Sequence, residues 1–192
     1  MILTPNEQES FDILVSKCKS TLAGPWKLDA YDWVFSVIAG GKFLAQNGCC
    51  PSVPIAQAIL ESGWGLKGFL FGIKATAQDI AEGQAQQVAT HEVEGGALTP
   101  ETDAFFLDKT IQGNFVHYLN YLKRMKPAFI NYFDMTPGLA DAGERFGFVD
   151  YLETNPRYST SFFDVAVLPN NDYRASIMSI IDDNKLWVFD HT

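Results

Sequence analysis

The sequence predicts a mainly α-helical domain that carries one small β-hairpin. Through most of the chain, apolar residues recur at intervals of three and four, which places them on one face of a helix. Residues 87–94 are typical of a β-strand instead, and Glu94-Gly95-Gly96 is a turn signal that leads into a return strand toward Phe106. A hydrophobic content of 47% and a charged content of 19% are those of a folded globular protein. The length of 192 residues suits a single domain with a proper core.

Two helices are expected before the middle of the chain. Thr4-Pro5-Asn6-Glu7 is a capping-box pattern with proline at the first helical position, and it predicts a helix over residues 5–22. Gly24-Pro25 ends this helix. A second helix, over residues 29–46, is apolar nearly all round, which indicates a buried central helix. Gly40-Gly41 inside it is expected to permit close packing or a bend.

The second half of the chain is expected to be mostly helical. Helical spacing predicts a helix over residues 110–126, with Pro127 marking its end. Two further helices are predicted over residues 141–153 and 173–183. The tail, residues 186–190, is short and apolar, so we expect it to pack back onto the core.

The most informative stretch is residues 51–74, PSVPIAQAILESGWGLKGFLFGIK. Ser52 is a suitable N-cap for a short helix over residues 53–62, and Gly63 and Gly65 stop this helix. Four residues form its expected apolar stripe, whereas three fall on another face: the stripe is Val53, Ala56, Ile59 and Leu60, and the other face is Pro54, Gln57 and Glu61.

Glu61 lies in the last turn of this predicted helix, beside a tryptophan. Its carboxylate would face the negative end of the helix macrodipole, and apolar neighbours would add a desolvation cost. Both effects raise the pKa of a carboxyl group and favour the protonated form that a general acid needs. The alternative is a solvated surface glutamate.

The same stretch resembles the catalytic signature of glycoside hydrolase family 73, the bacterial peptidoglycan N-acetylglucosaminidases of flagella and autolysins. The similarity extends from about residue 50 to residue 190 and is strongest at its start. The matching pieces are Pro51-Ser52-Val53, Ala56-Gln57-Ala58, Glu61-Ser62-Gly63-Trp64-Gly65 and Leu70-Phe71-Gly72-Ile73-Lys74-Ala75.

The resemblance implies a lysozyme-like α+β fold, in which a large helical lobe and a small β-hairpin lobe flank a glycan cleft. The expected organisation is N-terminal helices at 1–50, the catalytic helix and signature at 51–75, the hairpin lobe at 76–106 and C-terminal helices at 107–192. Glu61 matches the acid of the family.

The resemblance also implies a second carboxylate on the hairpin. Thr90-His91-Glu92 matches a Thr-x-Glu strand of the family, which makes Glu92 the candidate base or stabiliser. Period-two alternation places Glu92 on one strand face with Val88, Thr90 and Glu94. The alternative is a solvent-facing glutamate in an edge hairpin.

The sequence departs from the family pattern in two places. Phe105-Phe106-Leu107-Asp108 stands where the family has Phe-Arg-x-Tyr, and residues 167–173 replace a Gly-Tyr-Ala-Thr-Asp-Pro segment. The sugar-positioning tyrosine is therefore open between Tyr158 and Tyr173.

Two further aromatic residues are candidates for substrate binding. Trp64 and Phe71 offer flat faces to sugar rings, although either is also suited to the core.

The predicted activity is hydrolysis of β-1,4 glycosidic bonds in cell-wall glycan, as an endo-β-N-acetylglucosaminidase. Glycoside hydrolysis usually needs one protonated carboxyl group and a second group that supplies water or stabilises the transition state, and no metal or cofactor is expected. The alternatives are a muramidase of the same fold, which cuts the neighbouring bond, and a non-catalytic module that binds the wall or another protein.

The charge balance argues against nucleic acid as a partner. A formal net charge of −9 leaves no basic stripe to neutralise phosphates. A basic protein partner would complement this charge.

The three cysteines, Cys18, Cys49 and Cys50, lack metal-binding spacing. They are either buried free thiols or include one bridge from Cys18 to one of the adjacent pair.

The location of the substrate raises a question of delivery. No apolar run approaches the roughly 20 residues that cross a bilayer, and residues 1–10 show no secretory signal. We therefore expect a protein made in the cytoplasm that acts in the periplasm or cell wall after delivery by a phage particle or a contractile type VI secretion system. In the second case it would be an antibacterial effector toxin held in check by an immunity protein.

Overall fold

A helical lobe with one projecting β-hairpin makes up the computed structural model, which describes residues 1–47, 49–94, 97–124 and 173–191. At residues 90–94, 97–101, 173–174 and 191 the backbone alone is described. The elements are α1 (Pro5–Lys17), α2 (Ala30–Ala45), α3 (Ser52–Glu61), α4 (Ala77–Ala81), β1 (Ala85–Glu94), β2 (Ala97–Phe106), α5 (Ile111–Arg124), α8 (Tyr173–Asp183) and the 3₁₀ helix η2 (Leu186–His191). The predicted helix over residues 141–153 lies outside the described residues.

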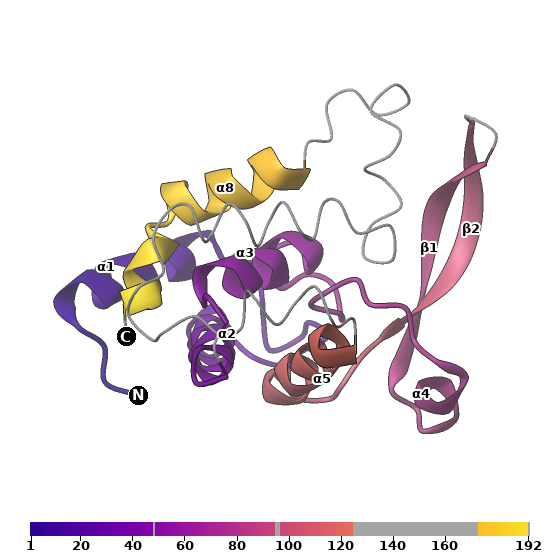
Figure 1. Cartoon of the computed structure of the whole chain (residues 1–192), viewed down its shortest axis with the longest axis horizontal. Coiled ribbons are helices and arrows are strands. Elements are labelled where there is room, and N and C mark those ends of the chain that lie inside the picture. The colour runs from indigo at the N-terminus through magenta and orange to yellow at the C-terminus, as the bar shows by residue number, and fades with distance from the viewer. Residues whose placement is uncertain (48, 95–96, 125–172, 192) are drawn as a thin grey trace.

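Most of the helices gather on one side, whereas α4 lies at the foot of the hairpin, and both chain termini lie on the side away from the hairpin (Figure 1). Strands β1 and β2 pair antiparallel from Ala85 opposite Phe106 to Glu94 opposite Ala97. The prediction of a mainly helical domain with one hairpin is confirmed.

Helix α1 begins as predicted but ends earlier. Thr4 accepts a hydrogen bond from the N–H of Glu7, and the Glu7 carboxylate accepts one from the N–H of Thr4, which completes the capping box. The helix ends at Lys17 rather than at residue 22, because the next residues turn away. The N–H of Lys19 donates to the carbonyl of Trp64, and the Ser20 hydroxyl donates to the carbonyl of Leu28.

Glu7 also ties α1 to the central helix. Its carboxylate is 1% exposed and lies 2.5 Å from the ammonium group of Lys42 on α2. Burial raises the pKa of Glu7, but hydrogen bonds from Lys42 and Thr4 outweigh this cost and leave the pKa below its ordinary value of 4.5. The pair therefore joins two helices through an ionised, satisfied carboxylate.

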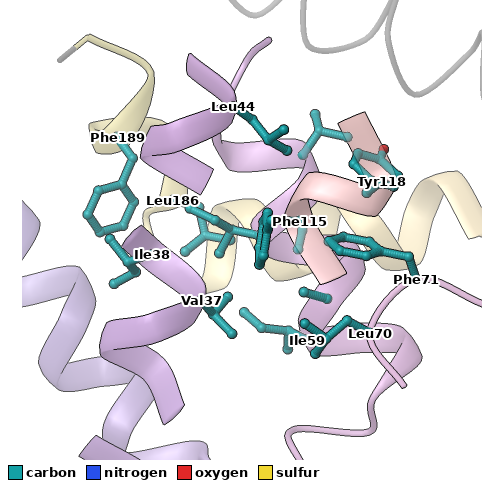
Figure 2. Packing of buried hydrophobic residues seen from close by; sticks show 14 of the residues in the cluster. Val37, Ile38, Leu44, Ile59, Leu70, Phe71, Phe115, Tyr118, Leu186 and Phe189 are labelled. Carbon is teal, nitrogen blue, oxygen red and sulfur yellow. The ribbon is translucent and has the colours of Figure 1, made fainter. Parts of the chain in front are cut away.

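Helix α2 is the buried central helix that the sequence predicts, and its two glycines allow close packing. A Cβ atom at Gly40 would lie 2.3 Å from the ring of Phe115 on α5, and one at Gly41 would lie 2.6 Å from the side chain of Ile55 on α3. Figure 2 shows Phe115 in the centre of the core, beside Val37 of α2. The helices on both sides of α2 thus approach its backbone directly.

Helix α3 is enclosed by α2, α8 and η2. Burial extends beyond the predicted apolar stripe, because every residue from Ser52 to Ile59 is buried, Pro54 and Gln57 of the other face included. The predicted cap is wrong. Pro51 occupies the N-cap position, and the N–H of Ser52 donates instead to the carboxylate of Asp190, at 2.9 Å.

The C-terminal segment packs back onto the core, as predicted. The side chains of Leu186 and Phe189 are fully buried, and Figure 2 shows both among the core residues. The Ser10 hydroxyl of α1 donates to the carbonyl of Asn184 at 2.6 Å, which fixes the segment between α8 and η2.

All three cysteines are free thiols in the structure, which confirms one of the two expected alternatives. Cys18 lies beside the carbonyl of Trp64, whereas Cys49 and Cys50 are buried just before α3. Burial raises the pKa of both buried thiols, and the nearby Asp190 carboxylate raises it further.

No helix in the described part of the chain has the length and apolar character needed to cross a membrane.

Substitution of Gly40 tests the close packing. Gly40→Ala adds a methyl group within 2.3 Å of the Phe115 ring, so it should lower the free energy of unfolding by about 1–3 kcal/mol. Chemical denaturation measures this change. Ser36→Ala, at a partly exposed position of the same helix, should change the free energy by less than about 0.5 kcal/mol. Equal stability of the two variants would contradict the packing described here.

Candidate active site

Glu61 is the last residue of α3, and the chain reverses immediately after it. Three consecutive residues have φ in the left-handed region, at +59° for Gly63, +64° for Trp64 and +87° for Gly65. The N–H of Trp64 donates to the carbonyl of Ile59 at 2.9 Å, which closes the last helical turn. The predicted helix stop is confirmed, and it leaves Glu61 at a fixed helix end.

The carboxyl group of Glu61 lies against the backbone of Gly72. A Cβ atom at Gly72 would lie 3.3 Å from Oε2 of Glu61, and φ of Gly72 is +57°. The backbone conformation therefore favours glycine here, and a larger residue would also crowd the Glu61 carboxyl group. Glu61 itself is partly exposed, and the returning chain at Gly72 lies against its carboxyl group.

Buried side chains pack beside Glu61 on the core side of α3. Gln57, one helical turn earlier on the same face, accepts a hydrogen bond of 2.5 Å from the hydroxyl of Tyr118 on α5. The Tyr118 ring stacks on Phe71, with ring centres 4.2 Å apart (Figure 2). The sequence shows Tyr118 only as one apolar position of a helix, so this contact was not predictable from spacing.

Phe71 is one of these buried side chains and does not lie on an open surface. Its side chain is 5% exposed, and its two described ring contacts are with Tyr118 and, edge-on at 5.0 Å, with Phe115. The prediction that Phe71 binds a sugar is not retained, because its ring is packed in the core.

Trp64 faces the first helix. Its carbonyl accepts the N–H of Lys19, and the ammonium group of Lys17 lies 6.0 Å from its ring centre. The ring is partly buried against the core. A sugar-binding role for Trp64 stays a prediction.

The base of the hairpin is joined to the segment that follows Glu61. The N–H of Phe106 donates to the carbonyl of Ile73, and the N–H of Ala75 donates to the carbonyl of Ala104, both at 2.8 Å. The Phe69 and Phe105 rings are stacked, with centres 5.0 Å apart.

An ion pair of 3.0 Å between Lys74 and Asp103 adds to this junction. The glutamate and the hairpin are therefore connected through a single short segment, residues 62–75.

The register shows which hairpin face is turned toward this segment. Gln86 pairs with Phe105, and its side-chain oxygen lies against Gly68. Alternation places Glu92 at a position on the same face as Gln86, six residues farther along β1 and opposite Thr99. Six residues of strand span about 20 Å, so this position lies well out from the hairpin base. The role of Glu92 stays a prediction.

Asp108 accounts for one departure from the family pattern. Its carboxylate accepts hydrogen bonds from the N–H and hydroxyl of Thr110, both at 2.8 Å, at the start of α5. The Gln84 amide, before β1, donates to the same carboxylate at 3.3 Å. Asp108 thus links the hairpin to α5 as a cap.

The two tyrosine candidates are not located by the described side chains. Tyr158 lies outside the described residues, and of Tyr173, the first residue of α8, the backbone alone is described. Both stay predictions for sugar positioning.

A cavity of about 350 Å³ lies between α2 and the start of α5, with Trp26, Phe35 and Lys109 in its lining. Glu61 is not among its lining residues, so this cavity is separate from the candidate site. No group of three or more His, Cys, Asp or Glu side chains suited to a metal ion occurs in the described part of the chain.

Comparison with known proteins identifies the fold. No family model and no curated protein matches the chain. Among solved structures, a peptidoglycan hydrolase mutant from Sphingomonas sp. A1 is 21% identical with a TM-score of 0.59, and the match covers 82% of this chain and 96% of that one. The catalytic domain of the autolysin Auto from Listeria monocytogenes is 17% identical with a TM-score of 0.59, over 98% and 99% of the two chains.

A third similar structure is the C-terminally truncated glycoside hydrolase domain of FlgJ from Salmonella typhimurium, which is 22% identical with a TM-score of 0.51, over 80% of this chain and 96% of that one. The chain therefore shares the fold of these peptidoglycan hydrolase, autolysin and glycoside hydrolase domains, and the predicted fold class is confirmed.

The junction at the hairpin base is testable through Phe69, which is 5% exposed. Phe69→Ala removes the stack with Phe105 and should lower the local free energy of opening by about 1 kcal/mol or more. Native-state hydrogen exchange should show faster exchange at the amides of Ala75 and Phe106. Leu66→Ala, at an exposed position of the same segment, should leave both amides protected. Unchanged protection in the Phe69 variant would show that the stack does not hold the hairpin.

Proposed function

We propose that this protein is a peptidoglycan hydrolase that cleaves β-1,4 glycosidic bonds of cell-wall glycan as an endo-β-N-acetylglucosaminidase. The observation that carries the proposal is Glu61, partly exposed at the end of a helix that is buried from Ser52 to Ile59 and set against Gly72. The fold shared with peptidoglycan hydrolase and glycoside hydrolase domains supports it.

In the proposed mechanism, Glu61 acts as general acid. It donates its proton to the glycosidic oxygen while the bond from this oxygen to the sugar C1 breaks, and water adds to C1. Positive charge develops on the sugar in an oxocarbenium-like transition state. A second carboxylate either stabilises this charge or acts as a base that takes a proton from the attacking water. A glutamate at a helix end, beside a backbone that excludes solvent on one side, suits the acid role.

Glu92 is the proposed second carboxylate. Its position on the hairpin face that bears Gln86 supports this role, because that face is turned toward the segment after Glu61. A separation of about 5 Å between the two carboxyl groups would suit a nucleophile, and one of about 6.5–9.5 Å would suit activation of water. If Glu92 stays remote during the reaction, the acetamido group of the sugar takes its place.

Substitution of the two glutamates tests the mechanism. Glu61→Gln keeps the shape of the side chain but removes the transferable proton, so hydrolysis of purified peptidoglycan should fall by about 10²- to 10⁴-fold. Glu92→Gln should cost less if that carboxylate only positions water. Glu82→Gln, an exposed residue after α4, is the matched control and should keep wild-type activity. Rates come from release of soluble fragments, with circular dichroism as the check on folding.

Product analysis separates the outcomes of this experiment. Mass spectrometry should find N-acetylglucosamine at the reducing end of the fragments, whereas N-acetylmuramic acid there would identify a muramidase. A folded Glu61→Gln protein with the wild-type rate would refute the mechanism. Wild-type protein that binds peptidoglycan and releases no fragments would instead identify a non-catalytic wall-binding module.

We also propose that the protein acts in the periplasm or cell wall as a delivered antibacterial effector, with a basic immunity protein as its inhibitor. The formal net charge of −9 supports a basic partner, since opposite charge speeds and orients association.

Expression in two compartments tests the site of action. Export of the protein to the periplasm of a Gram-negative host should reduce viable counts by several orders of magnitude through lysis, because the glycan is reached there. The same protein kept in the cytoplasm, and exported Glu61→Gln, should leave viable counts unchanged. Harmless periplasmic wild-type protein would contradict the effector role.

A further inference from the structure

The catalytic helix of the proposed mechanism receives its N-terminal cap from the other end of the chain. Helix α3 begins after Pro51, whose side chain has no hydrogen-bonding group, so its first N–H groups need an acceptor from elsewhere. The N–H of Ser52 donates to Oδ1 of Asp190 at 2.9 Å, across 138 residues of sequence. Asp190 is 4% exposed, so this contact is shielded from water.

The cap is rigidly mounted. Asp190 lies in η2 directly after Phe189, which is fully buried. The thiol of Cys50 lies beside the same helix start, with its Sγ 3.3 Å from the hydroxyl of Ser52. The negative charge of the Asp190 carboxylate lies at the positive end of the α3 macrodipole, where a carboxylate is stabilised.

The cap acts along the axis of α3. Apolar packing against α2 and α8 is non-directional, so it resists lateral separation of the helices better than a small slide along the axis. Directional contacts resist the slide: Asp190 at the first residue, and the hydrogen bond of Tyr118 to Gln57 in the middle. A helix of ten residues moves as a unit, so a slide at Ser52 would displace Glu61 by the same amount from Gly72.

We propose that Asp190 is a positioning residue for Glu61: it holds α3 at the axial position that places the acid against Gly72 and toward the substrate. This inference rests on the proposed function of Glu61. It makes the C-terminal segment part of the catalytic apparatus, although Asp190 does not touch the reacting atoms.

Three substitutions of Asp190 test this role, with kcat and KM measured on soluble glycan oligomers. Asp190→Asn keeps an oxygen acceptor in the same place, so kcat should stay within about threefold of wild type. Asp190→Ala removes the acceptor, and Asp190→Glu moves it by one methylene while retaining the charge. A displacement of about 1 Å at a catalytic group costs up to about 10²-fold, so both variants should lose about ten- to a hundredfold in kcat. Their KM should change by less than about twofold, since the substrate contacts are untouched.

Ser10→Ala is the matched control, because it loosens the same C-terminal segment without touching the α3 cap. Its kcat should equal that of wild type when the assay temperature lies about 20 °C under the thermal unfolding midpoint of the variant. This should hold even if the midpoint falls as far as in the Asp190 variants. Titration of the cysteines with a thiol reagent provides a readout without activity: Cys50 should react faster in Asp190→Ala than in Asp190→Asn.

The possible outcomes distinguish this inference from the proposed function. Wild-type protein without hydrolytic activity refutes the proposed function. Active wild type together with folded Asp190→Ala and Asp190→Glu variants of unchanged kcat refutes the positioning role. The positioning role is also refuted if Ser10→Ala loses kcat in proportion to its loss of stability. If Asp190→Ala does not fold, the comparison of Asp190→Glu with Asp190→Asn decides, and equal kcat in those two variants overturns the inference.

Discussion

The burial of α3 is the constraint on which the rest of the structure depends. A ten-residue helix is too short to be stable alone, so it persists only because its neighbours enclose it. Gly41 lets α3 approach the central helix, and α8 and η2 cover it from the C-terminal end of the chain. This enclosure leaves only the last two residues, Leu60 and Glu61, partly exposed, and Glu61 places a carboxyl group at the edge of the core.

The second consequence of this arrangement is a direct path from the acid to the hairpin. The Gly63-Trp64-Gly65 reversal sends the chain back past Glu61, so that Gly72 packs on the carboxyl group and residues 73–75 pair with β2. The helical lobe and the hairpin are therefore set relative to one another by the same residues that shape the acid site. Movement of the hairpin base would therefore shift the segment that packs on the Glu61 carboxyl group.

Several parts of this design were predictable because they depend on local chemistry. The capping box at Thr4, the close-packing glycines of α2 and the helix stop after Glu61 follow from backbone preferences of single residues. The hairpin followed from its turn signal and alternation. The resemblance in the signature agreed with the fold found among solved structures.

The sequence by itself determined which residues end helices, turn the chain and carry a carboxyl group, since these depend on neighbours within a few positions. Tertiary structure alone decided which surfaces of α3 are covered. Helical spacing places Gln57 and Pro54 on a face apart from the apolar stripe, but packing buries them as well, and the Tyr118 hydroxyl donates to the amide oxygen of Gln57. Tertiary structure also decided that the N-terminus of α3 is capped by Asp190 and not by the side chain of Ser52. Such a contact joins residues far apart in the chain, so periodicity and propensity contain no signal for it.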